Sequence, residues 1–142
     1  MSSFPVNEFL FASRSGSLLT NSDTANWAYI DELTLVFDET SGGLYLVTLT
    51  IPDTWNDNDM CGAEFRLVLG VSGGDATELA VGYYYSALAG QRVPFSLACL
   101  AEVFPTRGGV WVAAEWAARE GGTAYIGAKG LSSLSAIGQP VP

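Results

Sequence analysis

Acidic and amide side chains crowd one short segment of the chain, the stretch "IPDTWNDNDMCG" at residues 51–62. Carboxylate and amide oxygens are the ligands that Ca²⁺ takes in proteins, so this segment is the first candidate for a metal site. Asp57, Asp59 and Gly62 repeat the start of an EF-hand loop, but Val68 stands where that loop needs its twelfth-position glutamate. A looser calcium site remains possible on this pattern, with oxygen ligands from Asp53, Asn56, Asp57 and Asp59.

The same segment has a second interpretation as a turn between two strands. Asn and Asp are favoured in turns because their side chains hydrogen-bond the neighbouring backbone. Both interpretations predict an exposed, acidic connection at one end of the fold, where loops commonly carry binding residues. Apart from calcium, we expect no cofactor.

Two glycine-rich motifs resemble a catalytic loop and a phosphate-binding loop, but each lacks a feature that the function requires. "GVSGG" at residues 70–74 matches the nucleophile elbow, whose serine needs a base that is normally histidine, and this chain contains no histidine. "GTAYIGAKG" at residues 122–130 resembles a phosphate loop, but Ala128 separates Lys129 from the preceding glycine. We therefore predict a Gly–Ser turn at the first motif and a hairpin at the second.

Paired carboxylates are the remaining route to catalysis. Glu102 and Glu115 stand inside the apolar segments "LAEVF" and "AAEWA", and two carboxyl groups suffice for glycoside hydrolysis. A carboxylate on a strand is more often solvated or paired with an arginine such as Arg66. For Glu115 we favour a role in lining a subunit interface or central channel, and a small hydrolase is the third hypothesis for function. The prediction is that the protein is not an enzyme.

Aromatic residues supply the candidate binding surfaces. "VGYYYSA" places three tyrosines in a row, so that in a strand Tyr83 and Tyr85 face one way and Tyr84 the other. Such residues pack cores and interfaces, or stack on sugars. We predict a subunit interface containing Tyr83, Tyr85, Trp111 and Glu115. For a lectin-like alternative, the ligand-binding residues would be Trp27, Trp55, Asn56 and Tyr84, with Tyr29 as a further aromatic.

Short strands must position these residues. No helical period is sustained, and β-rich segments of alternating apolar residues recur between Gly, Pro, Asp and Asn. "WVAAEWAAR" at residues 111–119 is rich in alanine, which favours helix, but its apolar residues alternate as in a strand. The predicted strands cover residues 9–13, 33–37, 44–51, 64–71, 78–87, 94–104, 110–117, 123–129 and 131–137. This spacing predicts an all-β fold, an antiparallel jelly-roll sandwich of about nine to ten strands.

Composition favours a self-associating protein. Apolar residues make up 49% of the chain and charged residues 15%, against about 25% charged in typical soluble proteins. The segments "LYLVTL" and "SLACLA" are apolar on both faces, so each needs a second cover besides the core. We expect that cover to be another copy of the chain. At 142 residues the chain is predicted to be a single domain, with residues 1–8 as a flexible or interface arm.

Charge and sorting signals narrow the partners. The net charge is −9 and the six basic residues are scattered, so nucleic acid is not an expected partner. We find no signal peptide and no membrane span, and therefore expect no membrane insertion. We therefore expect a protein of the cytoplasm, or one assembled on a particle or surface without a cleavable signal. The two cysteines, Cys61 and Cys99, are expected to be free thiols.

Three segments together resemble a known superfamily: "GGLYLVTLTI", "FSLACLAEVFPTRGGVWVAAEW" and "LSSLSAIG". Their order, with Gly43-Leu44-Tyr45 early and Gly109-Val110-Trp111-Val112 late, resembles the jelly-roll heads of the tumour necrosis factor (TNF) and complement globular-head superfamily. The likeness covers residues 42–137. It departs at the closing strand, where "SSLSAIG" replaces a Phe-Gly or Phe-Ser-Gly step, and at the turn before Val110, which is Gly-Gly rather than Gly-Asp.

The resemblance implies a trimer with aromatic residues packed around its three-fold axis, and binding through loops or grooves. The leading prediction is therefore a non-enzymatic, homotrimeric jelly-roll module for assembly or for recognition of another macromolecule, a protein or a surface glycan. The alternative is a lectin-like carbohydrate-binding protein, with or without calcium as a cofactor.

Overall fold

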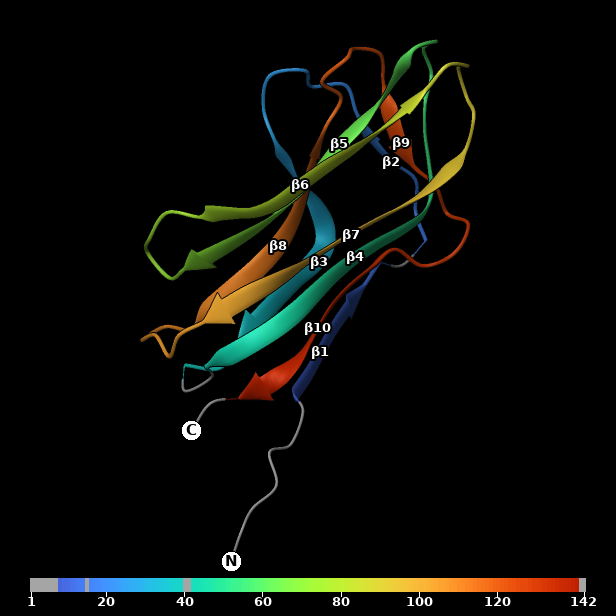
Figure 1. The fold of residues 1–142 in the computed structure, drawn as a ribbon. Coiled ribbons are helices and arrows are strands. Elements are labelled where there is room, and N and C mark those ends of the chain that lie inside the picture. Colours follow the sequence, from blue (N-terminus) through green and yellow to red (C-terminus); the bar gives the residue numbers. More distant parts are fainter. Residues whose placement is uncertain (1–7, 15, 40–41, 141–142) are drawn as a thin grey trace, which may run out of the picture.

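The computed structural model describes residues 8–14, 16–39 and 42–140, which form ten strands and no helix (Figure 1). The strands are β1 (Glu8–Ser13), β2 (Leu19–Asn21), β3 (Ala28–Phe37), β4 (Gly43–Asn56), β5 (Cys61–Val71), β6 (Thr77–Ser86), β7 (Val93–Val103), β8 (Val110–Ala117), β9 (Ala124–Ile126) and β10 (Ser133–Pro140). The predicted all-β class is confirmed, and β2 was not predicted. The proposed N-terminal arm lies outside the described residues, except for Glu8.

The strands form two antiparallel sheets. The four-stranded sheet has the order β3-β8-β5-β6. In the six-stranded sheet β4 is central: β7 pairs along one side of it, while β10 and then β9 pair along the other. β1 lies outside β10, and β2 lies outside β9. Each sheet turns one face toward the other, so that each also has an outer face.

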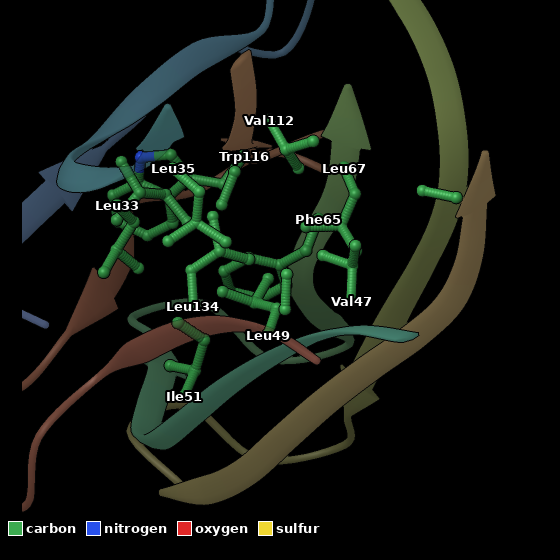
Figure 2. Packing of buried hydrophobic residues seen from close by; sticks show 14 of the residues in the cluster. Leu33, Leu35, Val47, Leu49, Ile51, Phe65, Leu67, Val112, Trp116 and Leu134 are labelled. Atoms are coloured by element: carbon green, nitrogen blue, oxygen red, sulfur yellow. The ribbon is translucent and has the colours of Figure 1, made fainter. Parts of the chain in front are cut away.

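Alternating apolar residues fill the space between the sheets, as Figure 2 shows. Val47, Leu49 and Ile51 of β4 are fully buried against Phe65 and Leu67 of β5. The faces predicted for residues 33–37 and 44–51 are confirmed, because in both segments every second apolar side chain is buried. Truncating one of these buried leucines to alanine would cost about 2–5 kcal/mol of folding free energy.

β4 is longer than predicted, which corrects the position of the acidic segment. The strand was expected to end at Ile51, but it continues through Pro52 to Asn56. Its register against β7 shifts between Ile51 and Thr54. Such an irregularity accommodates a proline, which has no N–H to donate to a neighbouring strand. Asp53, Trp55 and Asn56 are therefore strand residues, and only residues 57–60 form the connection to β5.

The hairpin predicted for residues 122–130 is wrong. β9 pairs with β2 and with the far end of β4, not with β10. The irregularity at Pro52 divides β4 into a segment paired with β10 and a segment paired with β9. Residues 127–132 connect β9 to β10 and so pass from one segment of β4 to the other. The Gly127 amide donates a hydrogen bond to the Asp53 carbonyl oxygen at 2.8 Å.

Other local predictions agree with the structure. Residues 110–117 form strand β8 rather than a helix. The Gly–Ser motif is a turn, closed by a hydrogen bond from the Gly74 amide to the Val71 carbonyl oxygen at 3.0 Å. Cys61 and Cys99 are free thiols, and burial raises the pKa of Cys99. Within the described ranges no helix is long and apolar enough to cross a membrane.

Candidate functional site

Four large apolar side chains form a row across the outer face of the six-stranded sheet. Phe9 of β1 lies opposite Ile137 of β10, Ile137 opposite Leu46 of β4, and Leu46 opposite Leu100 of β7. All four point away from the core, because their strand neighbours point into it. Their side chains are 43–65% exposed. We call these four residues the apolar row.

Further apolar groups extend the apolar row. Phe11 stacks beside Phe9 with ring centroids 6.1 Å apart, and Leu44 is exposed two residues before Leu46. Glu102, opposite Leu44, adds a charge at the margin. Monomeric soluble proteins seldom expose a large contiguous apolar patch without a binding role. The two strands predicted to be apolar on both faces, β4 and β7, both contribute to this one.

The predicted interface residues lie on the other side of the sandwich. Tyr83, Tyr85, Trp111 and Glu115 all belong to the outer face of the four-stranded sheet. Both tyrosines are exposed, and the Trp111 ring lies directly over Gly70. Glu115 is only 6% exposed, and its Oε1 accepts a hydrogen bond from Nε of Arg66 at 2.9 Å. These residues therefore do not contact the apolar row, and their interface role stays a prediction.

Trp27 covers part of the four-stranded sheet instead of standing free. The guanidinium carbons of Arg66 and Arg119 each lie 4.5 Å from its ring centroid. Arg119 in turn donates from Nε to Glu64 at 3.2 Å, and Arg66 pairs with Glu78 at 3.6 Å. Both guanidinium groups therefore occupy ring surface of Trp27 on which a sugar could otherwise stack.

Trp55 is held in a stack of three planar groups. The guanidinium carbon of Arg92 lies 4.0 Å from the centroid of the Trp55 ring. The Tyr125 ring stacks on Trp55 with centroids 5.1 Å apart and planes 8° apart. Arg92 also pairs with the buried carboxylate of Asp53 at 3.3 Å. Gly127 leaves the space for this arrangement, because a Cβ there would collide with Asp53 and Trp55.

Asn56 and Tyr84, the other two predicted ligand-binding residues, make internal hydrogen bonds. Nδ2 of the buried Asn56 donates to the carbonyl oxygens of Gly62 and Gly121, at 2.9 and 3.0 Å. The Tyr84 hydroxyl lies 3.0 Å from Oγ1 of Thr54. Burial raises the pKa of Tyr84 to about 12. Both residues fasten neighbouring segments to β4.

The predicted calcium ligands are dispersed. Oδ1 of Asp57 accepts a hydrogen bond from the Thr123 amide at 2.8 Å, and Oδ1 of Asp59 accepts one from the Ala89 amide at 2.7 Å. Asp53 is engaged with Arg92 instead. Among the described residues, no three His, Cys, Asp or Glu side chains gather as they would around a metal ion. The turn interpretation accounts for the contacts of Asp57 and Asp59.

Two depressions hollow the outer face of the four-stranded sheet. One, of about 210 Å³, is lined by Tyr29, Thr34, Trp111 and Ala113, where the pairing of β3 with β8 is interrupted. Tyr29 meets Trp111 edge to face, with ring centroids 6.3 Å apart. The second, of about 200 Å³, lies beside β6, and Glu64 and Tyr83 are among its lining residues. We call them the Trp111 depression and the Tyr83 pocket.

Comparison with known proteins finds similar structures but no similar sequence family. No family model and no curated protein sequence matches this chain. Among solved structures, 181 chains match. One of them, the Eiger TNF of S. frugiperda, aligns with a TM-score of 0.56 over 95% of this chain and 93% of that chain, at 14% identity. This chain has a TNF-like jelly-roll fold.

The TNF-like fold explains the resemblance noted in the sequence. Gly43-Leu44-Tyr45 begins β4 in the six-stranded sheet, and Val110-Trp111-Val112 begins β8 in the facing sheet. Tyr45 and Val112 are both part of the common core. The two motifs therefore begin one strand in each layer of the sandwich. The sequence signal that pointed to an outer binding face was the two-sided apolar pattern of β4 and β7.

Proposed function

We propose that this protein is a non-enzymatic module that assembles as a homotrimer through the outer face of its six-stranded sheet. The observation that carries the proposal is the apolar row, which runs across four neighbouring strands. A second copy is a suitable cover, because closed symmetric homo-oligomers are the commonest assemblies of soluble chains. The three-fold number follows the resemblance to TNF and complement heads.

The energetics suit an interface. Complete burial of a Leu, Ile or Phe side chain contributes about 1.5–3 kcal/mol. The side chains of the apolar row are about half exposed, so each would contribute about 1 kcal/mol on association. Phe11 and Leu44 enlarge the surface, and the sum has to exceed the entropy lost on association. The chain carries a net charge of −9, so nucleic acid is not proposed as a partner.

The positions of the two candidate catalytic carboxylates support a non-enzymatic role. Glu102 is exposed on the outer face of the six-stranded sheet, opposite Leu44. Glu115 belongs to the outer face of the four-stranded sheet and is paired with Arg66. Two carboxyl groups on opposite sides of a sandwich do not flank one scissile bond, as glycoside hydrolysis requires.

Light scattering coupled to size-exclusion chromatography tests the assembly. We expect the wild-type mass to be three times 15.0 kDa, about 45 kDa, and Leu46→Glu to yield a folded 15.0 kDa monomer. Val36→Glu is the matched control, because Val36 is exposed on the outer face of the four-stranded sheet. A monomeric wild-type protein at micromolar concentration would contradict the proposal, as would dissociation by Val36→Glu alone.

A carbohydrate-binding role is the second candidate, and the Trp111 depression favours it. Its lining includes Thr34 and two aromatic residues that meet edge to face, and one of these, Tyr29, is exposed. Aromatic faces stack on the C–H face of a sugar ring, while hydroxyl groups meet its rim. We expect glycan-array signals that Tyr29→Ala abolishes and Val81→Ala preserves. A blank array at high protein concentration would refute this second role.

A further inference from the structure

Exposed apolar groups also gather along β6, on the side of the sandwich opposite the apolar row. Val81, Tyr83 and Tyr85 occupy alternate positions on the outer face of this edge strand and are 46%, 69% and 52% exposed. Met60 and Leu88 are exposed in the two connections beyond its end. Those connections lie together, because the Met60 amide donates to the Ala87 carbonyl oxygen at 3.4 Å. We call these five residues the tyrosine face.

Composition distinguishes the tyrosine face from an ordinary surface. Tyr and Met are enriched in protein interfaces, and tyrosine is a frequent hot-spot residue. The tyrosine face also adjoins a cavity, since Tyr83 belongs both to it and to the Tyr83 pocket. The pocket reaches β5 at Gly62, which lies opposite Tyr85 and where a Cβ would collide with the backbone of Tyr84.

The Tyr83 pocket has an excess of negative charge. Its lining includes two glutamates, Glu64 and Glu120, and one arginine, Arg119. The arginine is already committed: its Nε donates to Glu64 at 3.2 Å, its Nη1 donates to the Thr24 carbonyl oxygen at 3.2 Å, and its plane stacks on a tryptophan. Glu120 is the second acidic residue of the lining; it is exposed, as is Tyr83, which lines the same pocket.

We propose that the tyrosine face and the Tyr83 pocket bind a protein partner that inserts an arginine side chain. A guanidinium group can form two parallel hydrogen bonds with the Glu120 carboxylate. Its flat face can at the same time lie against the Tyr83 ring, an attraction that the ring quadrupole strengthens. The surrounding apolar groups would exclude water from this contact. A positive group also complements a chain of net charge −9.

The proposed site is independent of the proposed assembly. The tyrosine face belongs to the four-stranded sheet and the apolar row to the six-stranded sheet, so self-association through the apolar row leaves the tyrosine face open. The monomeric Leu46→Glu variant is therefore expected to bind as the wild type does. Failure of one proposal would leave the other standing.

Titration followed by amide chemical shifts tests the pocket directly. The probe is N-acetyl-arginine methylamide at millimolar concentration, and the control is the citrulline analogue, which has the same shape without the charge. We expect arginine-specific shifts confined to the amides of Gly62, Glu64, Tyr83 and Glu120. Glu120→Gln should weaken the apparent affinity about tenfold and Tyr83→Ala about threefold. Glu78→Gln, an exposed acid-to-amide change on β6 outside the pocket, should leave it unchanged.

Several outcomes would overturn the proposal. Equal shifts with the citrulline analogue would show that charge is not recognised. Shifts spread over all acidic surfaces, with Glu120→Gln and Glu78→Gln equivalent, would show only general attraction of a cation to an acidic protein. Shifts of the same amides by methyl glycosides, and not by the arginine probe, would assign the pocket to a sugar. The absence of any shift would refute the pocket as an arginine site.

Discussion

Gly138 of β10 lies directly opposite Tyr45 of β4, and the Leu44 carbonyl oxygen and the Tyr45 ring occupy the space that a side chain at position 138 would need. A Cβ at 138 would stand 2.7 Å from Cδ1 of that ring. The Tyr45 hydroxyl reaches across β10 to donate a hydrogen bond to Oε2 of Glu8 on β1, at 2.9 Å. One tyrosine thus ties three strands together, and the glycine of "SSLSAIG" makes this possible.

Gly138→Ala should therefore destabilise the protein. Overpacking a close-packed site costs about 1–3 kcal/mol, because the ring or the backbone must move to admit the methyl group. Chemical denaturation would measure the loss. Gly16→Ala is the matched control, since the nearest atom to a Cβ there is 3.6 Å away. Equal midpoints for the two variants would show that the Leu44 backbone and the Tyr45 ring move aside without cost.

Alkaline pH should destabilise the fold through Tyr45, which is buried, and Tyr84, which is partly buried. Burial, and then the hydrogen bond to and charge of Glu8, raise the pKa of Tyr45 to about 12, and burial does the same for Tyr84. A tyrosine in the unfolded chain loses its proton near pH 10, so between pH 10 and 12 the folded state binds more protons. This contribution to stability is complete below pH 10 and is lost as the pH rises toward 12.

Thermal melts at stepped pH would measure this effect. Histidine is the side chain that normally titrates between about pH 6 and 8, and this chain has none. We therefore expect little change in the melting temperature over that range and a fall above pH 10. Tyr84→Phe should lessen the fall, and Thr54 retains its hydrogen bond to the Tyr125 carbonyl oxygen in that variant. A wild-type melting temperature that stays constant to pH 12 would be incompatible with this account.

Arg92 should stabilise the far end of β4 through charge and stacking together. Arg92→Ala leaves the carboxylate of Asp53 buried without its partner, and we expect a loss of about 1–2 kcal/mol. This is less than the 3–5 kcal/mol of a fully buried pair, because Arg92 is half exposed. Arg92→Lys should recover part of the loss, since lysine restores the charge but not the planar stack on Trp55. Urea denaturation and tryptophan fluorescence would report both changes.

The acidic connection should stabilise the fold without calcium. Asp57→Ala removes the acceptor of the Thr123 amide, and Asp59→Ala removes that of the Ala89 amide, at about 1 kcal/mol each. We expect identical melting curves in EDTA and in millimolar calcium. A calcium-dependent rise in the wild-type melting temperature, lost in Asp57→Ala, would instead establish a metal site that requires this connection to rearrange.

The core was predictable because alternation is a local property of the sequence. Leu33, Leu35 and Phe37 show it directly, and the structure buries all three. The full length of β4 was not predictable, because a proline normally ends a strand. Only the shift in register past Pro52 allows β4 to continue. This is why Trp55 and Asn56 were placed in a loop.

The candidate surfaces could be predicted only in part, because they depend on which strands are neighbours. The two-sided pattern of β4 and β7 indicated an outer apolar face through Leu46 and Leu100. Nothing local shows that Phe9 and Ile137 continue the same row, since their pairing joins strands from opposite ends of the chain. Likewise, the covering of Trp27 by Arg66 and Arg119 arises from contacts distant in sequence.

The pairing of β1 with β10 also decides how the fold would respond to force. Glu8 lies opposite Gly138, so the described chain enters and leaves the sandwich at adjacent points (Figure 1). Pulling these points apart would load the hydrogen bonds between β1 and its neighbour one after another, as in opening a zipper. Shear, which loads a whole ladder at once, would not occur. The protein should therefore yield to a small force when it is pulled from these two points.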